Sequence, residues 1–226
     1  GLRKEAVDWV AVLEEMTSRR DLRFLTMLSW QDIFPVRNLV KERRTWCPSC
    51  LSAQPNGKKY EPLIWNLQIV EKCPIHDVEL ESTCPICGQD NFVISRRHIP
   101  GYCNKCWGWL GMQSSNDDSL DYNREKNAAF NTEQMLVNLK FLVEYPFHAN
   151  IPQVSTVERL NILLNKVAGG NISMFAKIIE KPKSTVWGWM KGKNKATLKD
   201  ICSLCSVLGI TLQDFYLGEN DGAEVN

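Results

Sequence analysis

Apolar side chains recur every three or four residues near the start of the chain. Ala6, Val10, Leu13 and Met16 follow this spacing, and Trp9 lies beside them. Such a recurrence is typical of an amphipathic α-helix. We interpret this stripe as an ordinary packing face that belongs to a hydrophobic core.

The same spacing predicts several more helices. A short one lies around residues 22–28 and ends before Pro35, and a longer one spans residues 123–143. Pro146 and Pro152 then bracket a short linker, because proline interrupts helical hydrogen bonding. Helical spacing continues in the C-terminal third, so we expect a mainly α-helical chain.

Helix ends are marked in this C-terminal third. Gly169 follows a predicted helix over residues 157–167, as glycine often does, and Asn171 is placed to cap the next helix. Thr197 and Asp200 resemble a capping box with Asp in place of the usual Glu. The region is therefore predicted to be a bundle of short helices.

Helical periodicity fades over residues 46–111, where Cys, Pro, Gly and Trp become dense. The chain has nine cysteines, and seven of them lie between Cys47 and Cys106. The odd count and the spacing of two residues within pairs argue against disulfides and favour metal sites. Cys202 and Cys205 are also spaced in this way, but they lie on an apolar helical stripe and have no second pair. We interpret them as small buried side chains.

Cys84, Cys87, Cys103 and Cys106 form the pattern C-x2-C-x15-C-x2-C. Two tight turns of this kind each present two thiolates, and together they complete the tetrahedron of a zinc ribbon. Gly88 suits the backbone turn behind Cys87. The alternative is four buried free cysteines.

Cys47, Cys50, Cys73 and His76 form a second possible ligand set, with His98 as the alternative to His76. Each of the two sets supplies four protein ligands and leaves no open position for water. We therefore expect two structural Zn²⁺ ions and no enzymatic activity. A zinc hydrolase is the rival interpretation, and it would use acids that flank the cysteines; these are Asp77, Glu79, Glu81 and Asp90.

Basic residues are concentrated near the C-terminus. Residues 166–199 hold eight lysines and one acid, Glu180, in a chain whose formal net charge is only +1. Such a patch is typical of phosphate contact. A second basic run, Lys41, Arg43 and Arg44, precedes the first cysteine, and we expect it to be exposed, either touching DNA or solvated.

The lysine-rich segment resembles a helix-turn-helix of the Cro/repressor type. Phe175 and Ala176 match the first helix, and Val186 and Trp189 match the buried side of the second. Glu180 departs from the pattern, because the family usually has glycine at this turn. The residues that the resemblance places on DNA are Lys183, Ser184, Thr185, Trp187, Lys191 and Lys193, with Lys183, Ser184 and Trp187 facing bases. The alternative is a protein-interaction module with solvated lysines.

The order of the cysteine motifs resembles the TniQ/TnsD family of transposon target-selection proteins. The chain reads W-C-P-S-C-L at residues 46–51, C-P-I-H at 73–76, C-P-I-C-G at 84–88 and G-Y-C-N-K-C at 101–106. The resemblance covers residues from about 20 to 110. It implies a non-catalytic protein that binds double-stranded target DNA and recruits an AAA+ ATPase of the TnsC kind.

The resemblance leaves one alternative within the family and one outside it. Some members bridge a CRISPR effector complex to the ATPase, and the helix-turn-helix would then bind protein. A plain transcription repressor is the other alternative. For the leading interpretation we expect a cytoplasmic, nucleoid-associated protein, and the absence of an apolar run near 18 residues predicts no membrane span.

These observations predict a mainly α fold with small zinc-ribbon β elements. The expected parts are a helical N-terminal segment at 1–45, a tandem zinc-binding module at 46–112, a linker helix region at 113–150, a helix-turn-helix domain at 151–218 and a disordered tail at 219–226.

Overall fold

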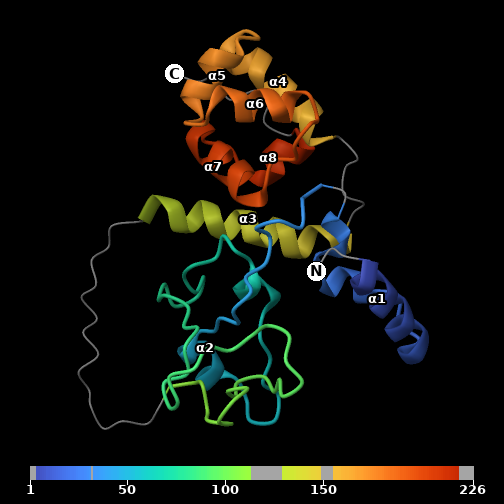
Figure 1. The fold of residues 1–226 in the computed structure, drawn as a ribbon, viewed down its shortest axis with the longest axis vertical. Helices are drawn as coiled ribbons and strands as arrows, with labels where there is room; N and C mark the ends of the chain where they lie inside the picture. The colour runs from blue at the N-terminus through green and yellow to red at the C-terminus, as the bar shows by residue number, and fades with distance from the viewer. Residues whose placement is uncertain (1–3, 32, 113–128, 149–154, 219–226) are drawn as a thin grey trace. The chain divides into compact units, whose positions relative to one another are not determined.

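The computed structural model describes residues 4–31, 33–112, 129–148 and 155–218 (Figure 1). The chain divides into two compact units. The helical unit comprises Gly1–Leu39 and Glu133–Asn226, and the cysteine-rich unit comprises Val40–Thr132. The parts that are described are mainly helical, as predicted. The predicted tail at 219–226 lies outside the described residues.

The predicted N-terminal helix is present as α1 (Lys4–Thr17), and it contacts the turn at Leu22–Leu25, but it buries no apolar stripe. None of its side chains is buried, and Trp9 and Met16 are 66% and 76% exposed. The expectation of a covered apolar stripe is therefore wrong in this structure. Two 3-10 turns, η1 (Leu22–Leu25) and η2 (Met27–Trp30), follow in place of the single predicted short helix.

The core of the helical unit joins the two ends of the chain. Trp30 donates a hydrogen bond from Nε1 to the carbonyl oxygen of Leu142 at 2.8 Å, and its ring packs edge-on against Phe141. The ring of Tyr216 packs edge-on against Phe34. The segment after η1 is therefore held by α3 (Ala129–His148) and by the last helix of the chain.

Helix α3 matches the helix predicted over residues 123–143, although residues 123–128 lie outside the described part. The helix continues through Pro146 to His148, so the first residues of the predicted linker are helical. Among the described helices, none combines the length and the apolar character that a bilayer crossing needs.

Five short helices form the C-terminal part of the helical unit, drawn in orange and red in Figure 1. They are α4 (Thr156–Ala168), α5 (Ile172–Ile178), α6 (Lys183–Met190), α7 (Leu198–Leu208) and α8 (Leu212–Leu217). The first three pack against one another, and α8 contacts both α4 and α7.

The predicted helix ends are confirmed. Gly169 closes α4 in the left-handed region at φ 54°, and the side chain of Asn171 accepts hydrogen bonds from two N–H groups in the first turn of α5. Thr197 and Asp200 form both bonds of a capping box. Helix α8 was not predicted, although Thr211 and Asp214 repeat the same capping pattern.

The cysteine-rich unit has little regular structure. It contains α2 (Pro48–Ala53) and η3 (Leu63–Asn66), and antiparallel contacts appear only as isolated bridges, with no named strand in the described residues. Its core is built from Trp46, Trp65 and a few aliphatic side chains around the cysteines. The expected β elements are therefore reduced to single bridges.

Candidate functional site

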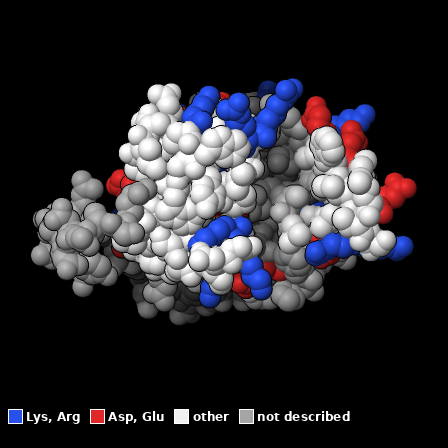
Figure 2. All heavy atoms as spheres, turned by 90° about the horizontal axis from the view of Figure 1, so that it is seen from below, with Lys and Arg blue, Asp and Glu red and all other residues white. Residues whose placement is uncertain are grey.

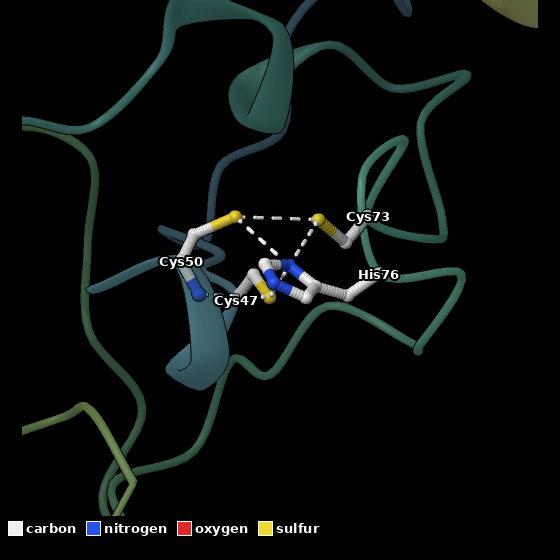
Figure 3. A group of neighbouring side chains, drawn as sticks. All are labelled: Cys47, Cys50, Cys73 and His76. Atoms are coloured by element: carbon white, nitrogen blue, oxygen red, sulfur yellow. Dashed lines mark hydrogen bonds between the residues drawn. The ribbon is translucent and has the colours of Figure 1, made fainter. Parts of the chain in front are cut away.

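The first of two clusters in the cysteine-rich unit contains Cys47, Cys50, Cys73 and His76, and it is called the first group below (Figure 3). The Cys50 and Cys73 sulfurs are 3.5 Å apart, and the His76 Nδ1 lies 3.2 Å from the Cys50 sulfur and 3.5 Å from the Cys47 sulfur. Three sulfurs and one ring nitrogen therefore converge on one point.

The second group contains Cys84, Cys87, Cys103 and Cys106. The sulfurs of Cys84 and Cys106 are 3.8 Å apart, and so are those of Cys87 and Cys103. Zinc–sulfur bonds of about 2.3 Å in a tetrahedron place two sulfurs about 3.8 Å apart. Within each group all ligand atoms lie within 4.8 Å of one another, so each group could hold a metal ion.

A repeated backbone turn positions the thiols. Asp77, Gly88 and Trp107 each follow the first cysteine of a pair by four residues, and each has a left-handed φ of 51°, 66° and 63° respectively. The N–H of each donates to the carbonyl oxygen of that first cysteine, for example from Gly88 to Cys84 at 2.9 Å. The turn predicted at Gly88 is thus confirmed and recurs in two other pairs.

Backbone N–H groups point at several sulfurs. The N–H of Lys105 lies 3.4 Å from the Cys103 sulfur, and the N–H of Gly108 lies 3.4 Å from the Cys106 sulfur. Burial raises the pKa of the Cys103 thiol, but the N–H groups of Cys106 and Lys105 outweigh it and bring the pKa to about 6. Such N–H donors favour the thiolate, which is the form that binds a metal.

In the first group, the surroundings of Cys50 disfavour the thiolate. Burial first, and the neighbouring Cys73 thiol second, raise the pKa of the Cys50 thiol. Buried thiols crowded together resist the loss of several protons when no cation is bound, since each new thiolate repels the others. A divalent cation at the centre would remove this penalty by compensating the charge.

His98, the alternative ligand, lies elsewhere. Its Nε2 is 3.6 Å from a carboxylate oxygen of Glu61, and burial together with the nearby Arg44 lowers the pKa of the imidazole. The structure therefore brings His76, and not His98, to the first group.

The acids that a hydrolytic zinc site would need are not ligands in either group. Glu81 pairs through its backbone with Trp46, and Asp90 forms an ion pair of 3.1 Å with Arg43. Among the described residues, neither metal-sized cluster includes a carboxylate.

The basic run before Cys47 is not uniformly exposed, which corrects the sequence-based expectation. Arg44 is 1% exposed, and Lys41 is half-buried with its Nζ donating to the Thr45 hydroxyl and to two backbone carbonyls. Only Arg43 lies largely in solvent. No sequence signal indicated the burial of Arg44, because its partners are 17 to 60 residues away.

The residues predicted to contact DNA lie on and just after α6. Lys183, Ser184 and Trp187 are exposed, and Thr185 is half-buried. Val186, Trp189 and Met190 face the opposite way and are buried, so α6 turns one face to solvent. Lys183, Trp187 and Lys191 are four residues apart and share this face.

One further lysine is held close to this face of α6, because Lys193 places its Nζ 4.5 Å from the centre of the Trp187 ring. Lys181, in the turn before α6, instead pairs with Asp200 of α7 at 2.7 Å. Basic side chains also occur elsewhere: Figure 2 shows a face on which Lys and Arg gather in separate groups divided by uncharged surface. On the exposed side of α6, the contact between the Lys193 Nζ and the Trp187 ring is a cation–π pair.

Comparison with protein-family models matches residues 3–80 to the TniQ family. The matched segment runs from α1 through the first group and covers about a third of the chain. Comparison with curated proteins found no match.

Proposed function

We propose that the chain is a TniQ-family protein with a role in transposition and that it selects the target site of a transposon. In this proposal it binds double-stranded target DNA and recruits an AAA+ ATPase of the TnsC kind. The observation that carries the proposal is the TniQ match over residues 3–80, which contains the whole first group. No catalytic step is assigned to the chain itself.

Two structural Zn²⁺ ions are part of the proposal. The sulfur spacing of the second group and the repeated backbone turn support tetrahedral coordination. The proposed ligands are Cys47, Cys50, Cys73 and His76 for one ion, and Cys84, Cys87, Cys103 and Cys106 for the other. When bound, each ion supplies folding free energy to a unit with few aliphatic side chains.

DNA contact is proposed for the α6 face. When lysines on an exposed helix face neutralise phosphates, the DNA releases the counterions that are condensed on it. An exposed Trp beside these lysines can reach base edges or the sugar. The proposed contacts are Lys183, Ser184 and Trp187 with bases in the major groove, Lys191 and Lys193 with the backbone, and Thr185 as a further contact to DNA. The exposure of these side chains, apart from the half-buried Thr185, and the pairing of Lys193 with Trp187 support this assignment.

Footprinting on the attachment DNA of the transposon tests the proposal. We expect a protected stretch with the full chain and its loss with Lys183→Ala combined with Trp187→Ala. Absence of protection at concentrations that saturate ATPase binding would overturn direct target recognition. Capture of the chain by a CRISPR effector complex in that case would instead indicate the bridging role.

A further inference from the structure

The cysteine-rich unit contains a buried ion pair between Arg44 and Glu61. Their side chains are 1% and 7% exposed. The Arg44 Nε donates to a Glu61 carboxylate oxygen at 2.8 Å, and a second bond joins the Nη2 to the other oxygen. Charges removed from water are strongly unfavourable unless their hydrogen bonds are complete. This pair is therefore informative about which segments must stay together.

Arg44 bonds to the segment that carries the second group. Its guanidinium donates to the carbonyl oxygens of Tyr102 at 2.7 Å and Ile99 at 3.1 Å, and to the side chain of Asn104 at 3.1 Å. Tyr102 and Asn104 are the two neighbours of Cys103. Glu61 contributes from the other side by accepting the N–H of Gly101 at 2.9 Å.

The same arginine lies close to the first group in the chain. Arg44 precedes Cys47 by three residues, and its guanidinium lies 6.0 Å from the ring of Trp46, which is fully buried. Trp46 exchanges both backbone hydrogen bonds with Glu81, at 2.9 and 2.8 Å, and Glu81 lies between His76 and Cys84 in the chain. One hydrophobic core contains cysteines of both groups.

We propose that the Arg44–Glu61 pair couples the two groups, so that they take up zinc as one cooperative unit. The inference rests on the zinc sites of the proposed function. If the second group is empty, the backbone around Cys103 loosens and Arg44 loses acceptors. A buried guanidinium without acceptors is costly, so the segment that carries Cys47 shifts and the first group loses its geometry.

The test measures the zinc affinity of the first group in the full chain by competition with a chromophoric chelator. Cys84, Cys87, Cys103 and Cys106 are changed together to Ser, which leaves only the first group. We expect its affinity to fall about 5- to 150-fold relative to the native chain, the range of ordinary coupling between sites. An unchanged affinity overturns the coupling.

A second comparison assigns the coupling to the ion pair. Arg44→Met with Glu61→Leu replaces the pair by apolar side chains and leaves no buried charge unpaired. In this background, removal of the second group is expected to change the first group's affinity less than about threefold, which is below the lower limit of ordinary coupling. Arg43→Met with Asp90→Leu is the matched control, because the side chains of that neighbouring pair are 62% and 32% exposed and so far less buried, and it should keep the full coupling.

Several outcomes separate the inference from the proposed function. A native chain that binds no zinc contradicts the proposed zinc sites. A chain that binds two ions with full coupling in the Arg44→Met/Glu61→Leu background overturns the assignment to the pair alone. If that variant does not fold, Arg44→Lys replaces it, since an ammonium cannot reach the spread acceptors. Unchanged coupling in Arg44→Lys then overturns the proposal.

Discussion

Glu180 lies in the turn between α5 and α6 with a left-handed φ of 52°. Its N–H donates to the carbonyl of Lys177, and the following Lys181 N–H donates to the carbonyl of Ala176. Glycine adopts this region readily, whereas a side chain is strained there. The departure from the helix-turn-helix pattern noted in the sequence therefore corresponds to a strained residue in the structure.

Glu180→Gly is expected to stabilise the helical unit by about 0.5–1 kcal/mol, because the gain from relieving the left-handed strain exceeds the entropy that glycine adds to the unfolded chain. Denaturant unfolding followed by helical circular dichroism measures the change. Glu180→Ala is the control, since it removes the carboxylate but retains the strained Cβ. A gain as large in the Ala variant would show that charge, and not conformation, is responsible.

Asp200 combines a helix cap with an ion pair. Its carboxylate accepts from the N–H and hydroxyl of Thr197 and from the Nζ of Lys181. Partial burial raises the pKa of Asp200, but the hydrogen bonds from Lys181 and Thr197 outweigh it and hold the pKa below its usual value. The stabilisation is therefore present above the unfolded-state pKa near 4 and is lost as pH falls through the lower folded-state pKa.

Asp200→Asn should destabilise the helical unit at pH 7 by about 1 kcal/mol, the scale of one helix cap. The difference from the native chain should shrink as pH falls below about 4, because the unfolded-state carboxyl is protonated there first and the native carboxyl follows at lower pH. Urea unfolding at a series of pH values measures both effects. Lys181→Met, which removes the ion pair and keeps the cap, should show a smaller loss. A difference that does not change with pH would contradict the assigned role.

At the scale of elements, the spacing of apolar residues predicted where helices form. It did not predict which parts of the molecule cover their apolar faces. The N-terminal stripe gave α1 correctly, yet Trp9 and Met16 are exposed, because periodicity identifies an apolar face and not its neighbour. Helix α8 was missed because it is only six residues long, too short for a periodic pattern. Its capping residues, Thr211 and Asp214, were the available signal.

The exposed face of α6 gives a prediction for DNA binding. Trp187→Ala should weaken binding to the specific target by about 1–3 kcal/mol and relax preference at one position, whereas Lys191→Ala should weaken binding to all sequences and lower the salt slope by about one. Titrations on specific and random duplexes at several salt concentrations distinguish the two. Lys140→Ala, on an exposed position of α3, is the control. Equal losses on both duplexes for Trp187→Ala would contradict a base contact.

At the scale of the whole molecule, the sequence predicted the two clusters but not what joins them. The spacing of two residues within each cysteine pair is a local property, and the structure brings all eight predicted side chains into two groups. The Arg44–Glu61 pair depends on acceptors 55 to 60 residues away, which no local pattern reveals. The packing of Trp30 and Phe34 against α3 and α8 was unforeseen for the same reason.

We propose that two zinc ions hold the cysteine-rich unit together. Limited proteolysis of the full chain, with zinc content measured before and after a strong chelator, tests it most directly. We expect two zinc ions per chain, and after their removal rapid cleavage within residues 46–107 while the α4–α8 helices keep their circular dichroism. A chain shown to be free of zinc that retains its protection across residues 46–107 would contradict the claim.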